Sequence, residues 1–319
     1  MNRQLDRVAQ WASSVGTRSP FGLVLQTGRS LLAAGTLLTL LTNGSDVLFH
    51  TPGGGDNPNC AQAGRFGLYC IFGAENLELA RWLSIGACAL AILGVMPALS
   101  SALYWIAAIS LFANAKPIDG GDQLTAILAF LLMLASVFDW RLFAWRRSNV
   151  AGRRFIAARV ILLFIPLQMG YLYLNSAVGK FSVPIWADGS ALWYWVQHTG
   201  FNAAPFTASV AWTVFQIPAV SAIATWGVLA LELFLAWGIV VARRRRTRFL
   251  VCALGVAFHL GIALVMGLIS FAIAMIAGLV LAVIRPGDLA AWATAPRSRS
   301  SPFPFSSPRV STVAQEVEQ

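Results

Sequence analysis

The sequence predicts an all-α, polytopic helical membrane protein with about eight transmembrane helices and with re-entrant or interfacial helices on its outer face. Of its 319 residues, 57% are hydrophobic and only 11% are charged, and the mean hydropathy is +0.68. A soluble domain carries about 25% charged residues. The apolar residues also gather in recurrent runs of roughly 17–24 residues, which are long enough to cross a ~30 Å hydrocarbon core as helices.

These runs predict membrane helices at residues 21–42, 79–97, 99–115, 123–142, 155–178, 220–241, 248–267 and 269–284. Pro97 is expected in the short turn between the second and third helices, and Met266-Gly267 in a tight turn between the last two. The first run is too long for a signal peptide and lacks a small-residue cleavage site, so we expect it to be retained. Between the fifth and sixth helices the chain is broken by prolines, which predicts the interfacial or re-entrant helices of residues 181–218.

The basic residues predict the orientation of the chain. They give a formal net charge of +10, but they occur in short runs between apolar spans, which indicates membrane topology rather than nucleic-acid binding. With a cytoplasmic N-terminus, the arginine-rich segments 141–159 and 243–248 both lie inside. Three parts follow: a cytoplasmic segment at 1–20, a transmembrane domain at 21–284, and a cytoplasmic tail at 285–319. The tail is rich in serine, proline and arginine, and we expect it to be disordered.

The stretch Tyr171–Trp195 differs most from the apolar helices around it, because it combines a lone lysine with a proline break and many aromatic residues. Lys180 has two interpretations. In a partly dry pocket its amine becomes a usable base or nucleophile. Alternatively, it extends to the outer head groups. Trp186, Trp193 and Tyr194 have the composition of an interfacial aromatic belt.

Three ionisable residues, Arg29, Glu232 and His259, fall well inside apolar runs. Each would cost a few kcal/mol against lipid, so we expect them to face the interior of the bundle and to meet one another. Glu232 and His259 are candidates for a proton relay or a polar substrate site, and the alternative is a structural polar cluster. Arg29 lies near enough to the cytoplasmic end to reach the interface, which favours a structural role.

Asp119 and Asp122 flank two glycines at the outer start of a predicted helix. A carboxylate at that position caps the helix amides, and the alternative is that one of the two pairs with Lys180. Cys60 and Cys70 lie in an outer loop, where an oxidising compartment favours a structural disulfide over two free thiols. Their spacing is wider than the C-x-x-C of redox pairs. No metal-ligand, phosphate-loop or serine-triad spacing occurs, so no metal is expected.

Several of these segments resemble one family. They are RSLLAAGTLLTLL at 29–41, the Pro58-x-Cys60…Cys70 loop, DGGDQ at 119–123, Tyr171-x-Tyr173 through Lys180, WADGSALWYW at 186–195, Trp226 through Glu232, and Phe258-His259 with MGLISF at 266–271. They occur in the order of the SdpB-like family of antimicrobial-peptide system proteins (sporulation-delaying protein B), and the resemblance covers about residues 21–284.

That family in turn looks like a branch of the HTTM group, which includes the membrane part of vitamin-K-dependent gamma-carboxylase. The carboxylase has its base lysine in a lysine–tryptophan–acidic–glycine segment, and Lys180, Trp186, Asp188 and Gly189 are the matching positions here. The present chain has no large lumenal domain after its helices, so carboxylation and vitamin K are not carried over, and the cofactor is left unknown.

The resemblance implies a protein of the bacterial inner (cell) membrane that matures a secreted peptide toxin. Its implied partners are an SdpA-like protein, an SdpC-like toxin precursor and the lipid bilayer, with no nucleic acid. The catalytic candidates are Lys180, Glu232 and His259. The substrate-binding candidates are Asp119, Asp122, Trp186, Asp188, Trp193 and Tyr194. Two alternatives stay open: a membrane enzyme that uses Lys180 as a base with a lipid-soluble cofactor, and a toxin immunity or transport protein with Glu232 and His259 along a polar path.

Overall fold

The computed structural model of the protein describes residues 19–51, 55–116, 119–146, 152, 155–198, 204–285 and 288. The predicted cytoplasmic segment at 1–20 and the tail at 285–319 lie almost wholly outside these residues. The helices described below belong to one unit that ends at Pro286.

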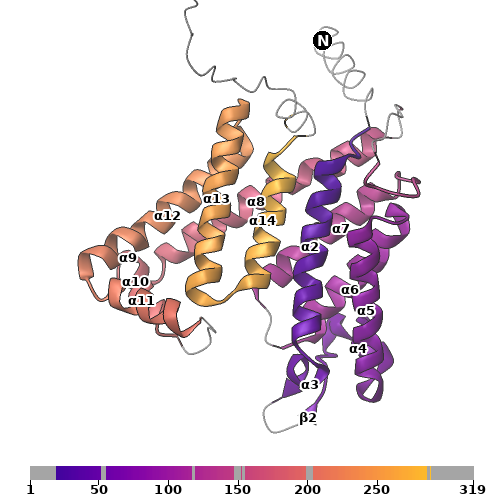
Figure 1. The fold of residues 1–319 in the computed structure, drawn as a ribbon, viewed down its shortest axis with the longest axis horizontal. Coiled ribbons are helices and arrows are strands. Elements are labelled where there is room, and N and C mark those ends of the chain that lie inside the picture. The colour runs from indigo at the N-terminus through magenta and orange to yellow at the C-terminus, as the bar shows by residue number, and fades with distance from the viewer. Residues whose placement is uncertain are drawn as a thin grey trace, which may run out of the picture. The chain divides into compact units, whose positions relative to one another are not determined.

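Within the described residues of this unit there are eight apolar helices of 15 residues or more, as predicted (Figure 1). They are α2 (Leu23–Thr42), α5 (Leu77–Leu93), α6 (Pro97–Asn114), α7 (Gly120–Ser136), α8 (Phe155–Phe181), α12 (Pro218–Val241), α13 (Arg245–Met266) and α14 (Ile269–Val283). Six of them are long and apolar enough to cross a membrane, α5 when counted with the residues from Ala74 that lead into it, and α7 and α14 are shorter at 17 and 15 residues. The chain is therefore an all-α polytopic membrane protein.

The short helix α14 lies inside the bundle, where it packs against α2, α7, α8 and α13. A helix of 15 residues spans only about 22 Å, less than the ~30 Å hydrocarbon core. Its buried residues run from Ala272 to Val283, whereas Ile269 at its start is 55% exposed. Small residues allow this close packing. A Cβ atom on Gly278 would lie 2.5 Å from the sulfur of Met169 on α8, and one on Gly28 of α2 would lie 2.3 Å from Leu281.

Some helix boundaries differ from the predicted ones. Pro97 does not lie in a turn but begins α6, because proline fits the first helical position, where its missing N–H is not needed. Helix α7 ends at Ser136 rather than at residue 142. The chain then turns back, and the side chain of Asp139 accepts hydrogen bonds from Arg141 at 2.7 Å. The predicted tight turn after α13 is confirmed, with Gly267 at a φ of 75°.

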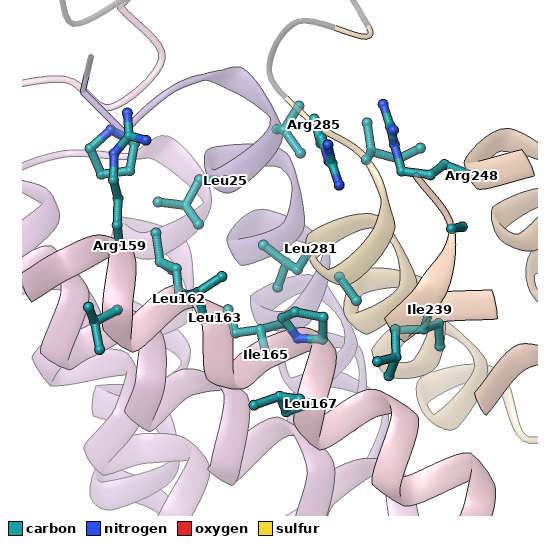
Figure 2. Close-up of a pocket in the computed structure, with 18 of the residues that line it drawn as sticks. Leu25, Arg159, Leu162, Leu163, Ile165, Leu167, Ile239, Arg248, Leu281 and Arg285 are labelled. Atoms are coloured by element: carbon teal, nitrogen blue, oxygen red, sulfur yellow. The ribbon is translucent and has the colours of Figure 1, made fainter. Parts of the chain in front are cut away.

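A cavity of about 790 Å³ opens among α2, α8, α12, α13 and α14 (Figure 2). Its walls are mainly leucine and isoleucine side chains. Three arginines, Arg159, Arg248 and Arg285, lie at one end of it, and Leu167 and Ile239 lie further along. Lys180 is on the same helix as Arg159 but near its other end, so α8 has one basic residue close to each of its ends.

The segment between α2 and α5 was predicted as a loop, but it contains short elements. These are α3 (Ser45–Leu48), a two-stranded antiparallel hairpin of β1 (His50–Thr51) and β2 (Gly55–Asp56), the 3-10 helix η1 (Gln62–Phe66), α4 (Leu68–Phe72) and the 3-10 helix η2 (Ala74–Asn76). They escaped prediction because they are too short for a hydrophobic period to develop.

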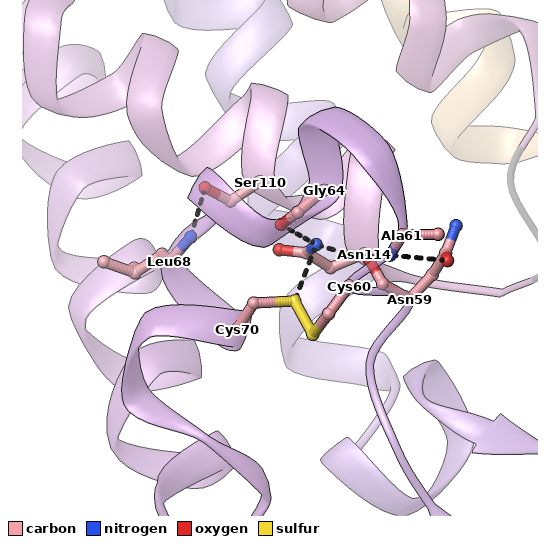
Figure 3. Close-up of a disulfide and its surroundings, with 8 residues drawn as sticks. All are labelled: Asn59, Cys60, Ala61, Gly64, Leu68, Cys70, Ser110 and Asn114. Carbon is pink, nitrogen blue, oxygen red and sulfur yellow. Dashed lines mark hydrogen bonds between the residues drawn. A yellow bond between two sulfur atoms is a disulfide. The ribbon is translucent and has the colours of Figure 1, made fainter.

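The predicted disulfide between Cys60 and Cys70 is present, and it links the residues before η1 to α4 (Figure 3). Asn114, fully buried at the end of α6, holds this region in place. Its side-chain amide donates to the carbonyl oxygens of Asn59 and Gly64, both at 2.9 Å, and lies 3.2 Å from the sulfur of Cys70. The disulfide therefore closes a structured segment that is anchored on a membrane helix. Of the other cysteines, Cys88 is buried and Cys252 is half-buried.

Between α8 and α12 the chain forms three short helices, α9 (Pro184–Ala187), α10 (Ala191–Trp195) and α11 (Pro205–Phe215). This confirms the prediction of a broken helical segment. Helices α9, α11 and α12 each begin at a proline.

Candidate functional site

An ion pair joins α8 to α12 at the start of this broken segment. The ammonium nitrogen of Lys180 lies 2.7 and 2.8 Å from the two carboxylate oxygens of Glu232. The side chain of Glu232 is 7% exposed and that of Lys180 is 21% exposed. Ser176 completes the cluster, because its hydroxyl accepts a hydrogen bond from Lys180 and donates one to Glu232 at 3.2 Å. A carboxylate buried this deeply needs both partners to offset its lost hydration.

The site is built on a continuous helix, although Lys180 was predicted to follow the end of α8. Helix α8 runs on to Phe181, and it ends there because Val183, which precedes Pro184, has extended backbone angles. Lys180 thus lies four residues, about one turn, after Ser176 on the same face. The lysine is 21% exposed and lies in an ion pair, a partner that neither interpretation of its environment named.

Trp186 forms one wall of this cluster. Its ring centroid lies 5.2 Å from the Lys180 ammonium, in a cation–π arrangement. The side chain is buried and packs with Ala191 and Leu229, so Trp186 is not part of an exposed aromatic belt. Tyr194, by contrast, is 55% exposed.

Helix α12 also holds the backbone that follows Trp186. The hydroxyl of Ser221 donates to the carbonyl of Gly189 at 3.4 Å, and the hydroxyl of Thr225 accepts from the amide of Leu192 at 3.3 Å. Trp226 donates its indole N–H to the carbonyl of Ala187 at 3.4 Å. One helix thus carries Glu232 and, through hydroxyl and indole groups on the preceding turns, positions the segment that covers Lys180.

Asp188 and Trp193 lie near the cluster but do not contact the ion pair. The exposed carboxylate of Asp188 accepts hydrogen bonds from the backbone and hydroxyl of Ser190 at 2.8 and 2.6 Å, and these bonds lower the pKa of Asp188 below its ordinary value. This is a turn-stabilising arrangement. Trp193 packs against Trp212 of α11, with ring centroids 6.1 Å apart.

His259 belongs to a second contact deeper in the bundle. Its Nε2 atom lies 2.8 Å from the hydroxyl of Tyr173, and the rings of Phe258 and Phe271 enclose it. Its Nδ1 atom is buried and has no hydrogen-bond partner among the described residues. Glu232 and His259 both face the interior as predicted, but they do not meet each other. Each binds a different residue of α8, seven positions apart, which corresponds to about 10 Å along the helix.

Arg29 lies in a separate polar cluster. It is 4% exposed and donates to Ser101 of α6 at 2.6 Å and to the side chain of Gln26. Ser101 in turn donates to Ser136 of α7 at 3.2 Å. Arg29 is therefore enclosed by neighbouring helices, and its guanidinium also lies 3.4 Å from the carbonyl oxygen of Pro97 at the start of α6.

Asp119 and Asp122 form a capping box at the start of α7, as the first of their two interpretations predicts. Asp119 accepts from the amides of Gly121 and Asp122 at 2.7 and 3.0 Å, and Asp122 accepts from the amide of Asp119 at 3.4 Å. The carboxylate that meets Lys180 is instead Glu232. Tyr173 and Ser176 were not predicted as site residues. The signal was present, since Tyr173, Ser176 and Lys180 recur at spacings of three and four.

In the part of the chain that the structure describes, no three histidine, cysteine, aspartate or glutamate side chains are placed to hold a metal ion. The chain is thus a polytopic helical membrane protein with a buried lysine–glutamate pair between two of its helices.

Comparison with known proteins is consistent with this class. The chain is 31% identical over 293 residues to the uncharacterised protein YitO of Bacillus subtilis (strain 168), a match that covers 89% of this chain and 92% of YitO. It is 29% identical over 273 residues to sporulation-delaying protein SdpB of the same organism, covering 84% of this chain and 83% of SdpB. The chain therefore belongs to the SdpB-like family. No protein-family model matches it, and no solved structure matches it.

Proposed function

We propose that this protein acts in a sporulation-delaying-type toxin system, as the membrane component needed to mature a secreted antimicrobial peptide. The proposed substrate is an SdpC-like precursor, and the proposed partner is an SdpA-like protein. The membership of the chain in the SdpB-like family supports this assignment. We place it in the bacterial cell membrane with both termini in the cytoplasm, for which the arginine distribution is the support.

The observation that carries the proposal is the ion pair of Lys180 and Glu232 beneath a partly exposed aromatic segment. A buried ion pair contributes little net stability, so its presence calls for another role. Helices α10 and α11 present large apolar side chains on the surface, among them Tyr194 at 55%, Phe206 at 77% and Trp212 at 47% exposure. These side chains offer contacts to an apolar precursor segment.

We propose different roles for the candidate residues. Trp193, Tyr194 and Asp188 contact the precursor, and Trp186 and Lys180 form the inner wall of the same site. The ion pair of Lys180 and Glu232 opens to hold the precursor. A carboxylate of the substrate then replaces Glu232 beside the ammonium group of Lys180. Asp119 and Asp122 act through the placement of α7. His259 acts through Tyr173, which fixes α8 against α13.

A second candidate function is an HTTM-type membrane enzyme with Lys180 as its base. One observation favours it: the lysine is hydrogen-bonded to a carboxylate and a hydroxyl, two groups through which its proton could leave. In this case the neutral amine of Lys180, which is the reactive form, arises only after the ion pair opens or after the lysine proton moves to Glu232.

Expression of the precursor and partner with and without this protein tests the proposal. Mature toxin, measured by mass spectrometry of the culture medium, is expected only when the protein is present. Normal mature toxin in its absence would contradict a role in maturation. Toxin resistance in cells that express this chain alone would instead assign it to immunity.

Single variants then test the site. Lys180→Met and Glu232→Gln are expected to abolish maturation. The amount of each variant in the membrane is measured alongside, because removing one partner of the ion pair also lowers stability. Lys116→Met is the matched control, because Lys116 is the other lysine of the chain and its side chain is exposed. Lys180→Arg separates the two candidates, since arginine keeps the charge but does not titrate. Maturation retained in this variant supports the ion-pair role, and maturation lost supports the base.

A further inference from the structure

We infer that a small cavity beside Arg29 is the binding site of one ordered water molecule, which bridges the guanidinium of Arg29 to the carboxylate of Asp139. The cavity lies where α2, α7 and the turn after α7 meet, and its volume is about 10 Å³. A bound water needs roughly 10–15 Å³ of such space and two to four polar partners. The cavity is therefore large enough for one water and for nothing larger. This inference does not depend on the proposed function.

Arg29 offers a hydrogen-bond donor that the neighbouring side chains leave unused. Its two terminal nitrogens donate to Ser101 at 2.6 Å, to the carbonyl of Pro97 at 3.4 Å and to the side chain of Gln26. Its Nε–H group is buried and has no hydrogen-bond partner among the described residues. A buried donor without a partner is costly, and ordered waters commonly satisfy such groups. Because Arg29 lines the cavity, a water there can accept this hydrogen.

Ser136 and Asp139 also line the cavity, and each has hydrogen-bonding capacity to spare. The hydroxyl of Ser136 accepts from Ser101 at 3.2 Å, and it donates to no acceptor among the described residues. Asp139 is 4% exposed, and its Oδ2 atom accepts one hydrogen bond, from Arg141 at 2.7 Å. A carboxylate oxygen has room for a second. A water can therefore accept from Arg29 and Ser136 and donate to Asp139, which gives it three partners.

The charges around the cavity favour a neutral ligand. Asp139 would repel an anion, whereas Arg29 and Arg141 would repel a cation. Asp139 pairs directly with Arg141, with Oδ1 and Nε 2.7 Å apart. Its charge also acts on Arg29, although no hydrogen bond joins these two side chains. A water between them lets one carboxylate serve both arginines, and it fastens the turn after α7 to α2.

Pulsed X-ray radiolysis of the full-length protein in lipid nanodiscs, followed by mass spectrometry, tests this assignment. The pulse converts water into hydroxyl radicals, which label the side chains next to it, so a buried side chain is labelled only if it lies beside a bound water. We expect label on Leu132, which lines the cavity and is only 1% exposed. Leu128 is the internal control, because it lies one turn earlier on α7, is fully buried and does not line the cavity. No label is expected there.

Ala144→Val fills the cavity from the turn after α7. Ala144 is buried and lines the cavity, and the two added methyl groups leave no room for a water. The label on Leu132 is expected to be lost. Ala126→Val is the matched control, because Ala126 is a buried residue of α7 that does not line the cavity, and it should leave this label unchanged. Continued absence of label on Leu128 reports that each variant is folded.

Absence of label on Leu132 in the unchanged protein would overturn the inference. Equal label on Leu128 would also overturn it, because that result indicates opening of the helix rather than a bound water. Label on Leu132 that persists in folded Ala144→Val has the same meaning. A structure that resolves ordered water decides the contacts. Density between Nε of Arg29 and the carboxylate of Asp139 supports the bridge, and a direct contact between these two groups would overturn it.

Discussion

The hydroxyl of Tyr173 lies 2.8 Å from Nε2 of His259, and this contact joins the middle of α8 to α13 inside the bundle. His259 is 1% exposed, and its second ring nitrogen has no partner among the described residues. Among the described residues, the Tyr173 hydroxyl is therefore the hydrogen-bond partner on which the buried imidazole depends.

Tyr173→Phe is expected to lower the free energy of unfolding by about 1–2 kcal/mol, because it leaves the buried imidazole with no hydrogen bond. His259→Phe removes both the imidazole and its need for a partner. The two variants should therefore be less than additive, and Tyr173→Phe should cost little in the His259→Phe background. Denaturant unfolding of the purified protein in detergent measures the four members of this cycle. Strict additivity would show that the contact contributes nothing.

For the ion pair, we expect a double substitution to restore stability without restoring function. Lys180→Met leaves the Glu232 carboxylate buried without its countercharge and should cost about 3–5 kcal/mol. The double variant Lys180→Met/Glu232→Leu should regain most of that stability, because an apolar pair replaces an ionic one. If the pair serves the substrate, the double variant stays inactive in the toxin maturation assay although it is stable. An active double variant would assign the pair to folding alone.

Gly189 offers a test of the segment that covers the ion pair. Its φ is 84°, and a Cβ atom there would lie 2.9 Å from the Cβ of Ala222. Gly189→Ala is expected to destabilise the protein by about 1–3 kcal/mol through backbone strain and to displace Trp186. Loss of tryptophan fluorescence intensity or a spectral shift would report that displacement. Gly227→Ala on α12 is the control, since no atom lies within 4 Å of its added Cβ. Equal effects of the two substitutions would contradict this prediction.

The disulfide gives a test of both the fold and the orientation. In intact cells, a membrane-impermeant maleimide is expected to label Cys60 and Cys70 only after reduction. Cys88, which is buried in α5, should remain unlabelled. Cys60→Ser is expected to cost about 3 kcal/mol, from the entropy of a loop of this length. Labelling that requires cell lysis would place the loop on the cytoplasmic side and reverse the proposed topology.

The helices could be predicted from the sequence. A transmembrane helix is specified by the length of an apolar run, which is a property of one chain segment. The sequence was also sufficient for the cap at Asp119, which is a local hydrogen-bond pattern. It could not identify the partner of Lys180. Asp119, Asp122 and Glu232 were all available carboxylates, and the choice depends on the packing of α8 against α12.

The partners of Arg29 and Lys180 were beyond the reach of the sequence for a common reason. Each residue was considered only within the apolar run that carries it. Arg29 instead finds Ser101 on a neighbouring helix, and Lys180 lies in a helix that continues to Phe181. In both cases a hydrogen-bond acceptor on another helix determines where the charge lies, and a single helix contains no information about that neighbour.

The position of α14 has a consequence for how the protein is made. This 15-residue helix packs against α2, so the last apolar helix of the described residues fills the space beside the first of them. Until translation has passed residue 283, α2 lacks one of its main neighbours, and the glycine surface around Gly28 stays uncovered. The final bundle therefore closes only after synthesis of the membrane domain is complete. Chains truncated before α14 would be left as open intermediates for the quality-control proteases of the membrane.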